Sequence, residues 1–207
     1  DRYTYGSMEN LTFQNITVDA SKTTYVGSIS RSYSTSIQNI QLNNITVVGN
    51  SNVAGFIGLM DEADVENITL KTVNVMGNSN NVAGLIGNIT NSISTKAKQF
   101  NIKADDVHVI STASSNHGIL YGSGGCSNST IKNSSVHGYN NVGGMAGSNN
   151  VYEGSKVSVE NCDISGNQYV GGISGTSGRI IDSSIVSNST ISGNNSSSLY
   201  VGGLAGY

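Results

Sequence analysis

The chain has 207 residues and a formal net charge of −3, with 26 Gly, no Pro, no Trp and only 11% charged residues. Its ten Lys and Arg residues are scattered, which excludes a basic face for nucleic acid, and no apolar run approaches the roughly 18 residues of a membrane-spanning helix. The remainder is Asn, Ser and regularly spaced single apolar residues, which predicts a folded repeat and not a disordered tract.

Asparagine returns at two fixed places in each repeat. The first asparagine column is Asn10, Asn39, Asn67, Asn101 and Asn128, with Lys156 and Ser183 in the same place late in the chain. The second asparagine column, five residues later, is Asn15, Asn44, Thr72, Asp106, Asn133, Asn161 and Asn188. Asparagine tolerates left-handed backbone angles, and its amide can bond to the next coil. We therefore predict two bends per coil, joined across coils by amide ladders.

An aliphatic column follows each asparagine column. Three residues after the first column stand Phe13, Leu42, Leu70, Ala104, Ile131, Val159 and Val186. Three residues after the second stand Val18, Val47, Val75, Val109, Val136, Ile164 and Ile191. Apolar residues alternate with polar ones here, which predicts two short strands per coil with one face inward.

A glycine phrase then closes each repeat: an aliphatic residue, two small residues, a second aliphatic residue, a small residue and a glycine. Full copies occupy residues 53–58, 82–87, 142–147, 170–175 and 201–206, and degenerate copies lie at 26–30 and around 117–122. The repeat glycines are Gly55, Gly58, Gly84, Gly87, Gly144, Gly147, Gly172, Gly175, Gly203 and Gly206. Successive copies are about 30 residues apart, a period typical of solenoids and propellers.

Together these elements predict an all-β fold, a right-handed parallel β-helix of about seven coils with three short strands per coil. The absence of Pro agrees with strands that are paired on both sides. We expect residues 1–207 to form one β-helix segment of a larger protein, with any export signal or anchor outside it.

The direction of the second aliphatic residue in the glycine phrase stays open. It stands three positions after the first, so a regular strand cannot point both residues inward. Either a bulge turns it in, or an apolar row faces solvent, made of Ile29, Phe56, Leu85, Met145, Ile173 and Leu204. We favour the bulge, because an exposed apolar stripe of that size is unusual.

Catalytic and metal-binding residues are sparse. Acidic residues do not cluster by column, so no pair of carboxylates is predicted for glycoside hydrolysis, and we expect no catalytic residue and no cofactor. Asp61, Glu62 and Asp64 share one loop and are weak candidates for a calcium site. They lack the spacing of a calcium-binding loop, so a solvated turn is the favoured interpretation.

The histidines and cysteines are interpreted as structural. His108, His117 and His137 fall at different places in their coils, and we expect all three at the surface. Cys126 and Cys162 occupy inward positions and are expected to be buried, small apolar side chains. Their spacing establishes neither a disulfide nor a metal site.

The segments of variable length are the best candidates for binding. They are residues 88–98, 148–154 and 194–199. Four tyrosines lie near these segments or the glycine phrase and form a possible binding surface for sugars or a protein partner: Tyr139, Tyr152, Tyr169 and Tyr200. The alternative, that these rings only shield the coil edges, is favoured over binding.

The glycine phrases at 142–147 and 201–206 resemble the GLUG repeat. The wider pattern through 67–70, 73–75 and 82–85 resembles the region before the catalytic domain in streptococcal immunoglobulin-A-cleaving metallopeptidases, and repeats in filamentous haemagglutinin-like adhesins. The resemblance implies an extracellular bacterial protein, secreted or attached to the cell wall. The zinc motif of those peptidases has no counterpart here, so the resemblance transfers no catalytic residue.

We therefore expect a non-catalytic platform whose partners are neighbouring domains of the same chain. One alternative is an adhesin segment that binds a host glycoprotein, such as immunoglobulin A or mucin, or a glycan. Another is a carbohydrate-active β-helix, which the lack of clustered acids disfavours.

Overall fold

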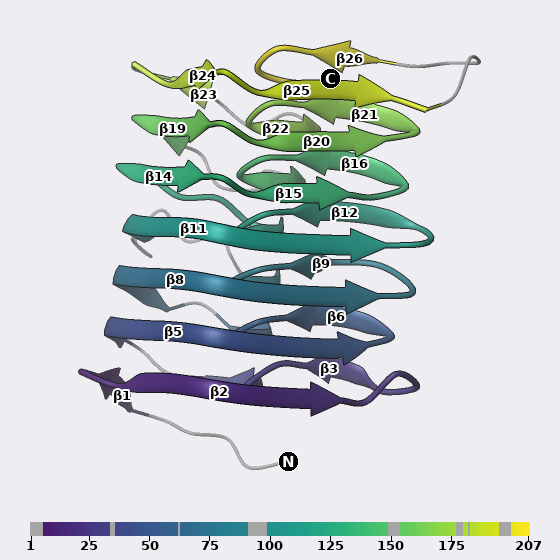
Figure 1. Cartoon of the computed structure of the whole chain (residues 1–207). Helices are drawn as coiled ribbons and strands as arrows, with labels where there is room; N and C mark the ends of the chain where they lie inside the picture. Colours follow the sequence, from purple (N-terminus) through teal and green to yellow (C-terminus); the bar gives the residue numbers. More distant parts are fainter. Residues whose placement is uncertain are drawn as a thin grey trace.

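The computed structural model describes residues 6–33, 36–61, 63–90, 99–148, 154–176, 180–181, 183–194 and 200–207. These residues form an all-β parallel solenoid, and the coils stack in sequence order from one terminus to the other (Figure 1). Within these ranges there is no helix of the length and apolarity needed to cross a membrane.

Three parallel sheets run along the solenoid. Sheet A consists of β1 (Ser7–Glu9), β2 (Thr12–Asp19), β5 (Ser36–Gly49), β8 (Asp64–Gly77), β11 (Gln99–Ser111), β14 (Ser129–Lys132), β15 (Ser135–His137), β19 (Val157–Glu160), β20 (Asp163–Gly166), β24 (Ile185–Ser187) and β25 (Thr190–Gly193). Sheet B consists of β3 (Thr24–Val26), β6 (Ser51–Ala54), β9 (Val82–Ala83), β12 (Ser115–Gly118), β16 (Asn140–Gly143), β21 (Gln168–Gly171) and β26 (Val201–Gly202). Sheet C consists of β4 (Ile29–Ser32), β7 (Ile57–Met60), β10 (Ile86–Ile89), β13 (Tyr121–Ser123), β17 (Ala146–Ser148) and β22 (Ser174–Thr176), and a separate pair joins β18 (Gly154–Ser155) to β23 (Ile180–Ile181).

The two predicted aliphatic columns are confirmed by the strand register. Val47 pairs with Val75 in the next coil, and every further member of its column pairs with its predicted neighbour. The column that contains Leu42 and Leu70 is equally continuous. In the inner coils these side chains are buried and pack into one core that runs along the axis.

Both asparagine columns adopt the left-handed backbone that the sequence predicts. Every residue of the first column has φ between 49° and 59°, and every residue of the second has φ between 48° and 60°. In β5, Asn39 makes two consecutive residues, Gln38 and Asn39, face outward, while Ile37 and Ile40 on either side stay buried. The left-handed residue thus turns the strand and keeps the apolar side chains inside.

Amide ladders join these residues from coil to coil. Asn39 donates to Asn10 over 3.0 Å and Asn67 donates to Asn39 over 3.1 Å, and Asn101 donates to Asn67 in turn. In the second column Asn44 donates to Asn15 over 2.8 Å. The ladders therefore satisfy polar groups that the bends place on the surface.

Two details of the predicted coil differ in the structure. The two predicted strands are separate in the last three coils, as β14 and β15, β19 and β20, and β24 and β25, but they form one continuous strand in β2, β5, β8 and β11, where the left-handed residues bend the strand without ending it. The glycine phrase is also not a strand. Its first residues end a strand of sheet B, the middle two form a bend, and its last residues begin a strand of sheet C.

In the later coils a serine hydroxyl bonds to the backbone at the place where two strands of sheet A are separate. Ser134 stands in the column of Val73 and Val107, where β14 and β15 are separate strands. Its Oγ accepts from the Val107 N–H over 3.0 Å and donates to the Lys132 carbonyl over 2.5 Å. Ser189 makes the same pair of contacts with Cys162 and Ser187. A polar residue is tolerated in the core here because its hydroxyl is satisfied.

The bend in the glycine phrase points its second aliphatic residue inward. Phe56, Leu85, Met145 and Ile173 are fully buried, whereas Leu204 in the last coil is 46% exposed. The inward direction that we favoured is confirmed in the inner coils, but a bend between two strands produces it, and not a bulge within one strand. The apolar row belongs to the core because the chain changes sheet between the two aliphatic positions.

Close backbone approach explains the glycine at the bend. A Cβ atom at Gly84 would lie 2.3 Å from the Ile119 carbonyl oxygen and 2.5 Å from Val107 Cγ1. Gly55 and Gly144 face the next coil in the same way. At Gly203, in the last coil, a Cβ would meet nothing within 4 Å.

The structure adds a third column that the sequence analysis missed. It immediately precedes each glycine phrase and consists of Tyr25, Asn52, Asn81, Asn116, Asn141, Tyr169 and Tyr200. Its members from Tyr25 to Tyr169 have φ between 49° and 68°. Asn81 donates to Asn52 over 2.8 Å, Asn116 to Asn81 over 3.0 Å and Asn141 to Asn116 over 2.9 Å. We call this set the third column.

Asn67 tests what the ladder residues contribute. Asn67→Ala should lower the free energy of unfolding by about 2–3 kcal/mol, because Ala loses the amide bonds and disfavours left-handed backbone. Asn67→Gly loses the same bonds but adopts the backbone freely, so it should cost about 1–2 kcal/mol. Urea unfolding followed by circular dichroism measures both, and equal losses would contradict a need for left-handed backbone.

The glycines at the bend give a matched pair. Gly84→Ala should destabilise the chain by about 3 kcal/mol or prevent folding, because its Cβ would overlap the next coil. Gly203→Ala, in the same position of the phrase, should change stability by less than about 0.5 kcal/mol. Thermal unfolding compares the two, and a Gly84→Ala chain as stable as the unmodified one would refute the close-packing explanation.

Candidate functional site

An aromatic cluster ends the third column. The rings of Tyr169 and Tyr200 stack with centroids 5.3 Å apart and planes 4° apart. Tyr207 packs edge-on against both, at 5.5 Å from Tyr169 and 5.9 Å from Tyr200. Tyr200 is 50% exposed and Tyr207 is 70% exposed. These three residues, the tyrosine cluster, present an aromatic surface to solvent.

The solenoid itself positions this cluster. Val170 pairs with Val201, so the tyrosines before them occupy equivalent places in adjacent coils. Their rings therefore stack at nearly the distance between coils, about 4.8 Å. The sequence pattern predicted Tyr169 and Tyr200 as binding candidates but not Tyr207, because Tyr207 follows the last glycine phrase and belongs to no column.

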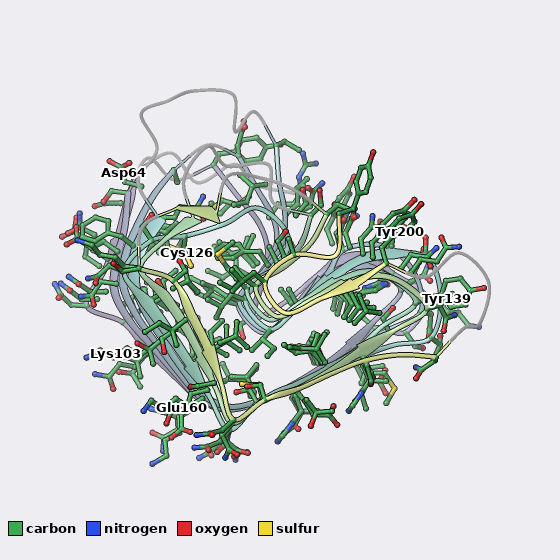
Figure 2. All side chains as sticks on the ribbon, turned by 90° about the horizontal axis from the view of Figure 1, so that it is seen from above. Asp64, Lys103, Cys126, Tyr139, Glu160 and Tyr200 are labelled. Atoms are coloured by element: carbon green, nitrogen blue, oxygen red, sulfur yellow. The ribbon has the colours of Figure 1, made fainter. Side chains whose placement is uncertain are left out.

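The other two predicted tyrosines lie elsewhere. Tyr139 is 45% exposed and sits in the turn before β16, at the same side of the coil as Tyr200 but separate from it (Figure 2). Tyr152 lies outside the described residues, as do most of the variable segments 88–98, 148–154 and 194–199.

The first coil carries a second aromatic group on the third column. The Arg31 guanidinium lies 5.2 Å from the ring centroid of Tyr25 and 5.2 Å from that of Tyr33. Arg31 also donates a hydrogen bond to the Tyr33 hydroxyl. These cation–π contacts place a positive charge here, which distinguishes this end from the tyrosine cluster.

The outer face of sheet A carries a network of titratable groups. His108 Nε2 lies 3.0 Å from Asp106 Oδ1, and His108 Nδ1 lies 2.9 Å from Ser135 Oγ. One coil further, His137 Nδ1 lies 2.6 Å from Ser165 Oγ. The Thr72 hydroxyl, and then His108, hold the pKa of Asp106 below its ordinary value.

Hydroxyl, imidazole and carboxylate follow the order of a hydrolase triad, but the surroundings differ from a catalytic site. The His108 and Asp106 side chains are 43% and 49% exposed, so water screens their charges. Neighbouring backbone N–H groups are engaged with the next coil, as in Gly138 N to Ser165 O at 2.9 Å. The geometry supports a surface hydrogen-bond network better than a preorganised nucleophile.

The acidic loop is described only in part. Asp61 Oδ1 accepts from Thr90 Oγ1 over 3.4 Å, and Glu62 lies outside the described residues. Across the part of the chain that the structure describes, no group of three or more His, Cys, Asp or Glu side chains could hold a metal ion.

His117 is not at the surface, which corrects the sequence analysis. It is fully buried in sheet B and pairs with Val82 and Val142 on either side. Neither ring nitrogen has a hydrogen-bond partner. Burial lowers the pKa of His117 to about 4, and the nearby Ser114 and Ala113 backbone opposes this only in part. His108 and His137 are half-exposed, as expected.

The same coil contains other buried polar groups. The Tyr121 hydroxyl has no partner in the core, and Cys126 lies nearby inside the solenoid (Figure 2). Burial raises the pKa of Cys126 to about 12 and also raises that of Cys162. Both thiols are free and buried, as the sequence analysis expected for apolar positions. Neither is suited to act as a nucleophile, because the thiolate is disfavoured.

Comparison with family models, curated proteins and solved structures found no match for this chain. The resemblance to GLUG repeats therefore stays a proposal.

His117 makes the stability of the fold sensitive to acid. Its folded pKa is about 4 against an ordinary 6.5, so its contribution is complete above pH 6.5 and falls as the pH drops toward 4. The loss amounts to about 3 kcal/mol. His117→Val should remove this slope and stabilise the chain at pH 7 by about 1–3 kcal/mol, since Val suits the register and needs no partner.

Urea unfolding at pH 7.5, 6, 5 and 4.5 measures this effect. His137→Asn is the control and should keep the slope, because it leaves His117 in place. A His117→Val chain with an unchanged difference between pH 7.5 and pH 4.5 would contradict a buried, neutral imidazole.

Proposed function

We propose that this chain is a non-catalytic platform: a right-handed β-solenoid rod of about seven coils that holds neighbouring domains at a fixed separation. One observation carries the proposal. The same register columns continue from coil to coil through sheet A, with backbone pairing at each step and amide ladders at the bends. Hydrogen bonds between every pair of adjacent coils favour a rigid solenoid.

The parent protein is proposed from the sequence pattern. The GLUG-like phrases suggest a bacterial protein that is secreted or attached to the cell wall, with this segment before a catalytic domain as in immunoglobulin-A-cleaving metallopeptidases. The inward direction of the second aliphatic residue supports a structural role for the phrase, because its side chains fill the core.

An adhesin segment is the second candidate function. The tyrosine cluster favours it, because exposed aromatic rings are typical of surfaces that bind proteins or sugars. Immunoglobulin A, mucin and glycans are the partners we propose for it. A carbohydrate-active enzyme has less support, since Asp106 pairs with His108 and Glu160 pairs with Lys132 over 2.7 Å.

A distance measurement tests the platform. Thr17 and Thr190 are exposed members of one outward column of sheet A and are six inter-coil steps apart. Spin labels on Thr17→Cys and Thr190→Cys should therefore give one narrow distance near 29 Å by double electron–electron resonance. The native thiols are buried and should not react.

A coil deletion provides the matched variant. Ile45 pairs with Val73, so removing residues 45–72 joins Asn44 to Val73 and preserves every column. The label distance should shorten by about 4.8 Å without broadening. A distribution several coil spacings wide in either chain would contradict a rigid platform.

A further inference from the structure

Two amides in the middle of the third column have free hydrogen-bonding capacity. Asn81 donates one N–H to Asn52 and accepts one from Asn116, and Asn116 likewise donates to Asn81 and accepts from Asn141. A primary amide has two N–H donors and two acceptor lone pairs. Asn81 and Asn116 each therefore keep one donor and one acceptor beyond the ladder, and both side chains are partly accessible.

The residues that directly precede the third column in the chain are uncharged. In the first six coils the preceding position is a hydroxyl or an amide: Thr24, Ser51, Asn80, Ser115, Asn140 and Gln168. Each of these side chains is partly or fully exposed. Hydroxyls, amides and the tyrosine cluster thus form one neutral strip along sheet B, from the second coil to the last.

Sheet A presents the opposite chemistry. Its outer face carries the Lys132–Glu160 ion pair and the His108–Asp106 pair, and Lys103 and Glu160 point outward from it (Figure 2). Tyr139 and Tyr200 lie at the far end of the coil from these charges (Figure 2). These charges of sheet A are thus separated from the tyrosine cluster.

We propose that this strip binds a linear, neutral polysaccharide that lies along the solenoid axis. The tyrosine cluster packs against the apolar faces of one or two sugar rings. The free amide donor and acceptor of Asn81, and those of Asn116, bond to pairs of sugar hydroxyls. A pyranose ring is comparable in length to the coil spacing of about 4.8 Å, so successive sugars meet successive coils.

The composition of the strip selects this ligand over the alternatives. Binding of an acidic polysaccharide would need basic side chains, and the strip from Asn52 to Tyr200 has none among the residues named. A protein interface of standard size would have an apolar centre, but most of the strip is amide and hydroxyl. The inference rests on the second candidate function and names its ligand class and site.

The test variant places at Tyr169 and Tyr200 the residue type that the third column has in the preceding coils. Tyr169→Asn with Tyr200→Asn replaces both rings by the residue that stands in the preceding coils. Asparagine adopts the left-handed backbone of Tyr169, where φ is 52°, so the fold should be kept or stabilised. Tyr139→Asn is the matched control, because Tyr139 is similarly exposed but lies off the column.

Isothermal titration with cellohexaose, chitohexaose and mannohexaose tests the neutral class, and hexagalacturonate tests the acidic class. At least one neutral hexasaccharide should bind the unmodified chain, more tightly than its disaccharide does. The double variant should bind at least tenfold more weakly, while Tyr139→Asn should bind like the unmodified chain.

Three results would overturn the proposal: silence toward every neutral hexasaccharide from folded protein, binding that the double variant retains, or binding of hexagalacturonate alone. Parallel titrations with immunoglobulin A and mucin separate the inferences. Binding of either protein without any free saccharide would uphold the adhesin candidate and still refute this site. If no ligand binds in any titration, this site and the adhesin candidate are both refuted, and the spin-label distance measurement alone then tests the platform.

Discussion

Left-handed backbone at three places per coil is the constraint on which the whole structure depends. Each such residue puts two successive side chains outside, so the strand turns while its apolar residues stay in the core. Asparagine supplies this conformation at low cost, and its amide then bonds to the coil above or below. Thr72 and Tyr169 hold the same angles with side chains that disfavour them, which implies that the stacked coils impose the conformation.

Much of the fold could be predicted because alternation and spacing are local properties. The Val47 and Leu42 columns follow from the sequence residue by residue, and the strand register agrees. The third column was not predicted, because tyrosine replaces asparagine at both of its ends and because its residues directly precede the glycine phrase. The burial of His117 was not predicted because its coil carries a degenerate copy of the glycine phrase, and only the pairing of His117 with Val82 and Val142 in the structure fixes its place.

The candidate site arises because the repeat stacks side chains of the same kind on the surface, whereas the core arises from the burial of apolar side chains. Repetition brings chemically similar side chains together, so a tyrosine pair becomes a stack and a row of asparagines becomes a row of amides. Tyr207 joins the cluster from outside the repeat, and no periodic argument could have placed it. The same repetition separates charges on sheet A from the neutral strip on sheet B. A platform and a binding surface are therefore compatible functions of one solenoid.

The backbone conformation of the three columns is the most direct test of this account. Nuclear magnetic resonance of the isotope-labelled chain gives φ for each residue from backbone chemical shifts and the coupling between amide and α protons. The account predicts positive φ at the asparagines of all three columns, and also at Thr72, Lys156 and Tyr169. Negative φ at these last three residues would mean that asparagine preference, and not the stacked coil, sets the bends, and would contradict the account.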